Sequence, residues 1–227
     1  MSLATDPAPD LGRPDAATVL VTVVETGSAQ GRTAAAQAVA DHWLAAPWPE
    51  GLLSLTCFTS LEDHLLLLYA QWEPGATPHA APADDASLSR ATAGLADTVR
   101  IHPSVDYVVH RSTVADHTAA PAFFSVDAFR TTGREATHAW MDRALALEAE
   151  AGAHTAPGAV SGHLHVSGDG ARMLNLSGWV SPAAHAEFLA GGALRQVFEA
   201  LGSPGTPCVG SSGYRLHTSL TAPSAPR

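Results

Sequence analysis

The sequence contains no lysine: all 12 of its basic residues are arginine, against 22 Asp and Glu, and the formal net charge is −10. Without lysine the chain cannot form a Schiff base, a P-loop phosphate site or a Ser-x-x-Lys pair. A surface this acidic repels phosphate backbones, so we expect no binding to nucleic acid.

Cysteines and long apolar runs are also scarce. Cys57 and Cys208 are too few for a disulfide framework or a four-thiolate metal site. The longest aliphatic run, Leu65–Leu68, is far shorter than a membrane span, and residues 1–16 contain no apolar run typical of a signal peptide. We therefore expect no membrane association and, most simply, a cytoplasmic location.

The sequence does contain an internal repeat. Segments 51–72 and 158–179 both begin with glycine and end with tryptophan, and an offset of 107 relates them. The same offset relates Tyr107 to Tyr214. One offset that holds over more than 50 positions indicates a tandem duplication.

Each repeat has the pattern of an α+β unit. A β-branched or aromatic run is followed by an Ala-rich helical stretch, a hairpin, a second helix and a final strand. This βαββαβ order is the split-βαβ, ferredoxin-like unit. The predicted elements are strands 18–24 and 123–129, helices 28–46 and 134–151, turns 60–64 and 167–170, helices 86–99 and 182–201, and final strands 105–111 and 214–218.

The domain organisation follows from the repeat. We predict a first ferredoxin-like repeat over residues 17–111, a linker over 112–121 and a second repeat over 122–217. The chain ends, residues 1–16 and 218–227, are predicted to be disordered.

The hairpin of the second repeat predicts one polar face. Because side chains alternate along a strand, a turn centred on Asp169 would place His163 opposite Asn175. One face would then carry His163, His165, Met173, Asn175, Ser177 and Trp179, and the other Leu164, Val166, Leu174, Leu176 and Val180. The corresponding polar face of the first repeat would carry Thr56, Phe58, Leu66, Leu68, Ala70 and Trp72. Since that set is mostly apolar, we predict that the second repeat has the functional cavity and that the first is structural.

The chemistry of this polar face favours an aromatic ligand. The sequence has no dinucleotide fingerprint, Gly-x-Ser-x-Gly, His-Glu-x-x-His or Cys-x-x-Cys motif. Hydrogen-bond donors, an imidazole and an aromatic wall suit the binding of a planar phenol and the removal of a proton from it. The resulting carbanion can react with O₂ without a protein-bound metal or flavin, so we predict no cofactor.

The duplicated unit, together with the segments Tyr69-Ala70-Gln71-Trp72 and Asn175-Leu176-Ser177-Gly178-Trp179, resembles the antibiotic biosynthesis monooxygenase family. The resemblance implies that the two repeats form an intramolecular pseudo-dimeric α+β barrel. It also implies a cofactor-independent monooxygenase that oxidises an aromatic polyketide or anthrone-like substrate with O₂ in secondary metabolism. The chain would be a monomeric pseudo-dimer or a homodimer.

The resemblance also assigns candidate site residues. Quinone-forming members have a cavity Asn and Trp four residues apart, which Asn175 and Trp179 match, and some have a His fourteen residues before the Trp, which His165 matches. The first repeat has Leu68 at the Asn position, and the family's helix Arg has no aligned equivalent, although Arg195 is near. A strand-one Asn of some members is missing, and Asp127 and Ser125 are the nearest polar residues.

We therefore predict catalytic roles for Asn175, Trp179 and His165, and substrate-binding roles for His163, Ser177, Met173, Arg195, Tyr214 and Trp72. His163 and His165 are spaced as metal ligands can be, but no third ligand is evident, so no metal site is predicted. The main alternative is a non-oxidative aromatic binding protein or cyclase-like protein on the same scaffold. Haem binding and degradation is a less favoured third reading.

Overall fold

The computed structural model describes two compact units. Unit 1 comprises residues 1–107 and 215–227, and unit 2 comprises residues 108–214. The described residues are 4–5, 8–76, 85–95, 99–115, 118–150, 156–202 and 204–222, without the side chains of 4–5, 85–87, 193–194 and 206–210. No helix within these ranges is long and apolar enough to cross a membrane.

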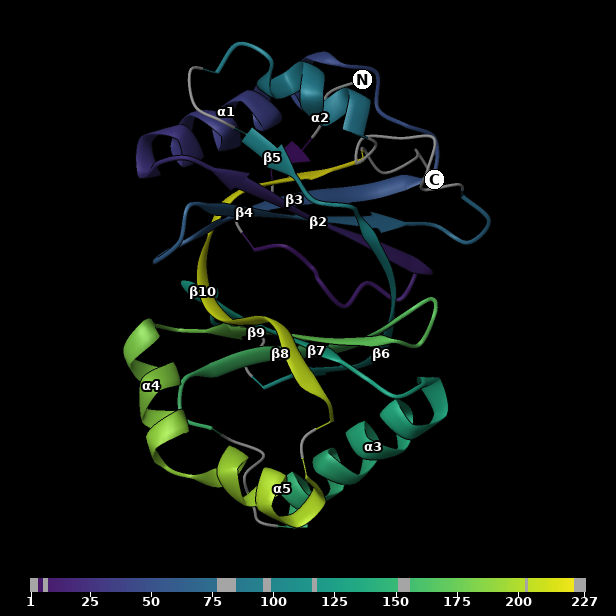
Figure 1. Cartoon of the computed structure of the whole chain (residues 1–227), viewed down its shortest axis with the longest axis vertical. Coiled ribbons are helices and arrows are strands. Elements are labelled where there is room, and N and C mark those ends of the chain that lie inside the picture. Colours follow the sequence, from purple (N-terminus) through teal and green to yellow (C-terminus); the bar gives the residue numbers. More distant parts are fainter. Residues whose placement is uncertain are drawn as a thin grey trace. The chain divides into compact units, whose positions relative to one another are not determined.

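Unit 1 has an antiparallel sheet with helices on one face (Figure 1). Its elements are β1 (Ala4–Thr5), β2 (Thr18–Thr26), α1 (Ala29–Ala45), β3 (Leu52–Ser60), β4 (Leu65–Trp72), α2 (Asp85–Thr92), β5 (Val99–Ile101), the start of β6 (Val105–Val114) and the end of β10 (Thr206–Thr221). β4 lies between β2 and β3, β2 also pairs with β5 and β6, and β10 lies next to β3.

The core of unit 1 fills the space between this sheet and its helices. α1 begins after Ser28, whose side chain accepts a hydrogen bond from the backbone N–H of Gly31. The small Ala35 and Ala36 allow α1 to approach the sheet closely, and Val39 and Trp43 pack on the same apolar cluster. The sheet contributes Leu20, Val24, Leu52, Leu55, Cys57, Leu66, Leu68, Ala70, Trp72 and Leu220.

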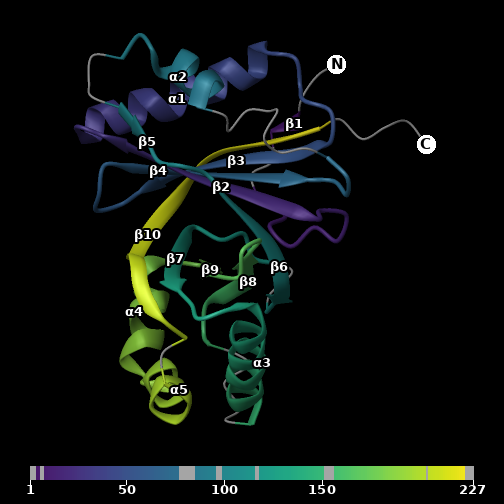
Figure 2. The ribbon, with the colours of Figure 1, turned by 45° about the vertical axis from the view of Figure 1, so that its right-hand side comes forward.

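Unit 2 repeats this plan. Its elements are the end of β6, β7 (Phe123–Arg130), α3 (Arg134–Glu150), β8 (Ala159–Ser167), β9 (Arg172–Trp179), α4 (Pro182–Ala190), α5 (Ala193–Leu201) and the start of β10. The strand order is β6-β8-β9-β7-β10. Figures 1 and 2 show α3, α4 and α5 on one face of β7, β8 and β9, which we call the helix-facing side.

The predicted repeat is confirmed in the strand bounds. β3 and β8, and likewise β4 and β9, begin and end 107 residues apart. Gly51 and Gly158 both have positive φ, at 76° and 83°, which favours glycine over residues with a Cβ. The α+β, ferredoxin-like fold class is therefore confirmed for each unit.

Two predicted helices differ from the structure. The single helix predicted over 182–201 is wrong: α4 and α5 are separated by Gly191 and Gly192, and Gly192 has a left-handed φ of 80° that ends a helix. The helix predicted over 86–99 ends earlier, at Thr92, and residues 99–101 form β5 instead.

The disorder predicted for the chain ends is wrong for several described residues. Leu11 is buried, and its carbonyl accepts a hydrogen bond from the Tyr69 hydroxyl at 3.0 Å. At the other end, Leu220 belongs to the apolar cluster of unit 1. Expected repeat ends at residues 111 and 217 fall inside β6 and β10, because both strands continue from one unit into the other.

Candidate functional site

The register of the β8–β9 hairpin decides which predicted site residues share a face. Leu164 lies opposite Asn175, and His165 lies opposite Leu174. The helix-facing side of β9 carries Met173, Asn175, Ser177 and Trp179, as expected, but both histidines are on the other face. The predicted grouping of His163 and His165 with Asn175 is therefore wrong.

The reason is the length of the turn. A turn centred on Asp169 would pair Ser167 with Ala171 across a three-residue loop, and the observed loop is one residue longer. Ser167 and Arg172 close a four-residue loop, in which the backbone N–H of Gly170 donates to the Ser167 carbonyl at 2.8 Å. Gly170 has a φ of 71°, and the Ser167 hydroxyl donates to the Asp169 carboxylate at 2.6 Å. A shift of one residue moves a whole strand to the opposite face.

The first hairpin shows the same shift. Cys57 lies opposite Leu68, so Thr56 and Phe58 are on the face opposite Leu68, contrary to the prediction. The helix-facing side of β3 carries Leu55 and Cys57 instead. Burial raises the pKa of the Cys57 thiol to about 12, so this cysteine stays protonated and unreactive.

A hydrogen-bonded row of polar side chains crosses the helix-facing side of unit 2. The Asn175 side chain donates from Nδ2 to the Asp127 carboxylate at 3.3 Å, and its Oδ1 accepts from the Ser177 hydroxyl at 3.2 Å. Asp127 is directly opposite Asn175 on the neighbouring strand β7. We call Asp127, Asn175 and Ser177 the polar row. All three are only half-buried, so their side chains are partly accessible to solvent.

An aromatic group lies next to the polar row. The Trp179 indole N–H donates to the Ser125 hydroxyl at 3.3 Å, which fixes the ring against the sheet. The ring centroid of Trp179 is 5.0 Å from that of His185 and 5.2 Å from that of Phe188, both on α4. Phe123 on β7 adds a second contact to His185, at 5.3 Å.

The β8 residue next to the polar row is a glycine. Gly162 lies opposite Ser177 on β8, and a Cβ added to it would be 3.9 Å from the Ser177 hydroxyl and 3.2 Å from that of Thr113. Met173, at the other end of this side, is buried with Val166 and Met141 under α3. Met173 therefore belongs to the packed core of unit 2, and its predicted contact with substrate stays a prediction.

His163 and His165 are buried on the other face of the sheet. His165 donates from Nδ1 to the Leu174 carbonyl at 3.2 Å, and His163 is 3.0 Å from the Ser112 hydroxyl. Burial lowers the pKa of His163 to about 3 and that of His165 to about 4. Both rings are neutral at pH 7 and are very weak bases. Within the described ranges, no three His, Cys, Asp or Glu side chains are placed to hold a metal ion.

The remaining predicted residues are not part of the polar row. Tyr214 is buried opposite Phe124, on the same face as the two histidines. Trp72 is in unit 1, where its indole N–H has no hydrogen-bond partner among the residues described. Arg195 is exposed on α5, with its Nε 3.7 Å from the Glu199 carboxylate.

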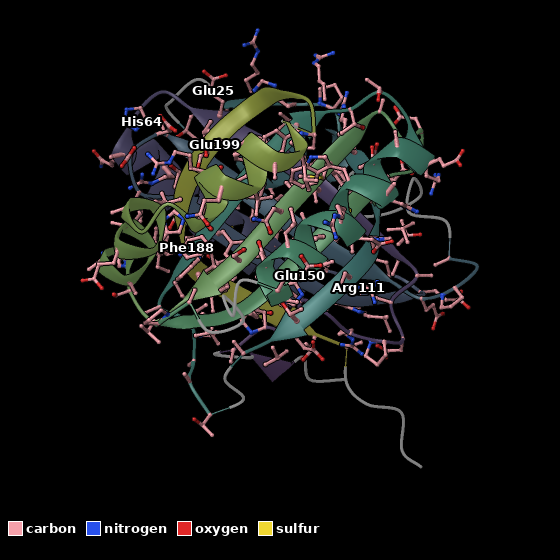
Figure 3. The ribbon with its side chains drawn as sticks, turned by 90° about the horizontal axis from the view of Figure 1, so that it is seen from below. Glu25, His64, Arg111, Glu150, Phe188 and Glu199 are labelled. Atoms are coloured by element: carbon pink, nitrogen blue, oxygen red, sulfur yellow. The ribbon has the colours of Figure 1, made fainter. Side chains whose placement is uncertain are left out.

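Arg195 lines an open depression at the surface rather than the polar row. The depression has a volume of about 420 Å³ and is lined by Leu189, Arg195, Phe198 and Glu199. Figure 3 labels Glu199 on α5 and Phe188 on α4. The depression is therefore lined by residues of α4 and α5, and α4 also contributes His185 and Phe188 to the aromatic group.

Two residues of this arrangement had no role in the sequence prediction. The sequence identifies Asp127 only as a polar residue on the first strand of the repeat, and it assigns no role to His185. The spacing does contain a signal for His185, because Ser181-Pro182 is a typical helix start. A residue in the first turn of such a helix remains close to Trp179, where the preceding strand ends.

Comparison with solved structures identifies the fold. An anthrone oxidase-like protein is similar over 94% of this chain and 98% of its own, with a TM-score of 0.65 and 16% identity. Candidate monooxygenases from Fusobacterium nucleatum and Lactobacillus acidophilus have TM-scores of 0.58 and 0.54 at 11% and 10% identity. Both matches cover 91% of this chain. They cover 94% of the Fusobacterium protein and 96% of the Lactobacillus protein.

No protein-family model matches the sequence, and no curated protein sequence matches it. At these identities the structural likeness shows the fold alone. The chain has the fold of monooxygenase-like proteins, and the ferredoxin-like fold that the antibiotic biosynthesis monooxygenase resemblance implies for each repeat is thereby confirmed.

Proposed function

We propose that this protein is a cofactor-independent monooxygenase that oxidises an anthrone-like phenolic compound with O₂. The observation that carries the proposal is the half-open polar row of unit 2, in which Asn175 lies between Asp127 and Ser177 beside Trp179. The fold shared with an anthrone oxidase-like protein supports it.

The polar row offers a donor to a substrate oxygen. An asparagine amide has two N–H donors, and Asp127 accepts one of those of Asn175. The second would donate to the substrate carbonyl or phenol oxygen, on which negative charge grows as a proton is lost. A fixed donor of this kind typically contributes about 10²–10³-fold to the rate. Trp179, held by Ser125, would form an aromatic wall against the substrate rings.

The proposed reaction needs no reactant other than O₂. Removal of one proton from the anthrone methylene gives a carbanion stabilised by the neighbouring rings and the oxyanion. The carbanion transfers its electrons to O₂ and forms a C–O bond, and the peroxide takes up a proton. Loss of water from the hydroperoxide then gives the quinone, so that CH₂ and O₂ become C=O and H₂O.

An oxygen electrode tests this proposal. Purified protein with anthrone, in buffer with EDTA and without added flavin, is expected to consume one O₂ per quinone formed. Asn175→Ala should lose about 10²-fold in rate. Leu68→Ala is the matched control in unit 1 and should change the rate little, measured at a temperature where the variant remains folded.

The result that would overturn the proposal is saturable binding of anthrone to folded protein without O₂ consumption above the rate in buffer. That outcome favours the non-oxidative binding protein on the same scaffold. A Soret band on titration with haemin, again without anthrone oxidation, would favour the haem-binding alternative.

A further inference from the structure

The proposed reaction needs a proton acceptor on the helix-facing side of unit 2. His165, the residue predicted from the sequence, is on the opposite face and donates its Nδ1 proton to the Leu174 carbonyl. The helix-facing side nevertheless has an imidazole next to Trp179, at His185.

The start of α4 fixes the position of His185. α4 begins at Pro182, directly after Ser181, whose hydroxyl accepts from the backbone N–H of Ala184 at 3.1 Å. The backbone N–H of His185 in turn donates to the Ser181 carbonyl at 3.4 Å. Because the link from Trp179 to α4 is so short, the first turn of the helix stays beside the end of β9.

The imidazole of His185 lies against two neighbouring aromatic rings of the sheet. Trp179 meets it edge-on, with an angle of 61° between the ring planes and 5.0 Å between the centroids. Phe123 meets it at 39° and 5.3 Å. Trp179 is buried, whereas the imidazole is only half-buried, so the imidazole is the part of this group that a substrate can contact.

The charge around His185 suits a base that becomes positive. Partial burial lowers the pKa of His185, so the ring is neutral at pH 7 and has one nitrogen lone pair that can take a proton. The negative charge of Asp127 acts in the opposite direction and raises this pKa. Asp127 lies on the helix-facing side of β7, the strand that also provides Phe123 beside His185, so its negative charge would favour the imidazolium once it forms. Asn175 holds the Asp127 carboxylate in place.

We infer that His185 is the proton acceptor of this site and that Asp127 stabilises its protonated form. This inference rests on the proposed function. The substrate C–H bond breaks, its electron pair stays on the substrate carbon, and the proton moves to the imidazole. After the C–O bond forms, the imidazolium returns the proton to the peroxide, and the ring is neutral again before water is lost.

Proton removal can be measured without O₂. Under nitrogen in D₂O, the wild-type protein should accelerate the exchange of the anthrone methylene protons for deuterium, followed by NMR. His185→Gln should lower this exchange rate and the aerobic kcat by the same factor, about 10²–10⁴-fold. Binding of anthrone, followed by quenching of tryptophan fluorescence, should change less than threefold (about 0.65 kcal/mol), since glutamine keeps a polar side chain of similar length.

His138→Gln is the matched control. His138 is an imidazole on α3 of the same unit, and burial lowers its pKa as well, but its ring stacks on His110 and not on Trp179. This variant should exchange and oxidise anthrone at the wild-type rate. His185→Ala should regain exchange in proportion to added imidazole, which a purely structural role of His185 would not allow.

Failure of this inference is distinguishable from failure of the proposed function. If the wild type consumes O₂ and folded His185→Gln exchanges and oxidises anthrone at the same rate, His185 is not the base. If the wild type neither exchanges the methylene protons nor consumes O₂, the proposed function and the inference both fail.

Discussion

The helix-facing sides of the two units have the same strand geometry but opposite polarity. Matched by strand register, the pairs are Leu68 with Asn175, Ala70 with Ser177, Leu20 with Ser125, Thr22 with Asp127 and Leu55 with Gly162. In unit 1 these five side chains are all buried, whereas the polar row of unit 2 is half-open. One duplicated scaffold therefore has a filled core in one copy and an accessible polar surface in the other.

The paired tryptophans show how this difference arises. Trp72 and Trp179 occupy the same strand position, but only Trp179 has a hydrogen-bond partner for its indole N–H, at Ser125. The matching residue in unit 1 is Leu20, which has no acceptor. A tryptophan at this position therefore serves packing in unit 1, and the added serine orients it in unit 2.

The largest expected effect comes from introducing the unit 2 residue into unit 1. Leu68→Asn removes a fully buried leucine and places an amide among apolar side chains, with Thr22 and Cys57 opposite it on the two neighbouring strands. We expect the free energy of unfolding to fall by about 3–5 kcal/mol, measured by urea denaturation. A loss below about 1 kcal/mol would mean that this side of unit 1 is not closely packed.

The reverse exchange, Asn175→Leu, should act on the reaction and not on the fold. The half-open position tolerates a leucine, so we expect unfolding to change by less than about 1 kcal/mol. The rate of O₂ consumption with anthrone should fall about 10²-fold because the oxyanion donor is lost. Unchanged turnover in a folded variant would remove Asn175 from the proposed mechanism.

Acid should destabilise unit 2 through its two buried histidines, which replace Thr56 and Phe58 of unit 1. His163 and His165 have pKa values lowered to about 3 and about 4, so the unfolded chain takes up protons below pH 6.5 that the folded chain does not. Stability is therefore complete above pH 6.5 and falls as the pH decreases towards these values.

Between pH 7 and 5.5 the two histidines should together lower the free energy of unfolding by about 2 kcal/mol. His165→Phe, the residue of unit 1, should remove about half of this pH dependence in urea denaturation at the two pH values. If the free energy of unfolding of His165→Phe depends on pH as strongly as that of the wild type, groups other than His165 cause the acid sensitivity.

The smallest effect concerns the indole N–H. Ser125→Ala leaves the Trp179 donor without its acceptor, as Trp72 is in unit 1, and should cost about 1 kcal/mol of unfolding free energy. Leu20→Ala in unit 1 is not a suitable control, because it also opens a cavity. Ser125→Cys is the control, since it replaces the hydroxyl with a group of similar size. Equal stability of Ser125→Ala and the wild type would make this hydrogen bond energetically neutral.

Much of the fold was predictable because the two repeats show the same pattern of elements. The offset from Gly51 to Gly158 and from Trp72 to Trp179 allowed the strand positions in one repeat to be inferred from those in the other. The helix 134–151 was predictable from composition, and α3 spans Arg134–Glu150. The break at Gly191-Gly192 was missed because an Ala- and Leu-rich segment continues beyond it.

The site was only partly predictable. Asn175 and Trp179 were placed correctly on one face because alternation along a single strand does not depend on the turn. The relation of His165 to that face does depend on the turn, which the Gly170 conformation and the Ser167–Asp169 hydrogen bond decide. The position of His185 required the path of the chain from β9 into α4, which strand alternation does not describe.

The location of Leu220 in the apolar cluster of unit 1 has a consequence for synthesis of the chain. Unit 2 is one continuous segment, whereas unit 1 needs residues from both ends of the sequence. A chain emerging from the ribosome from its N-terminus therefore has all of unit 2 available before unit 1 is complete. We expect the copy that is translated second to reach its native packing first, while the copy translated first waits for the final strand.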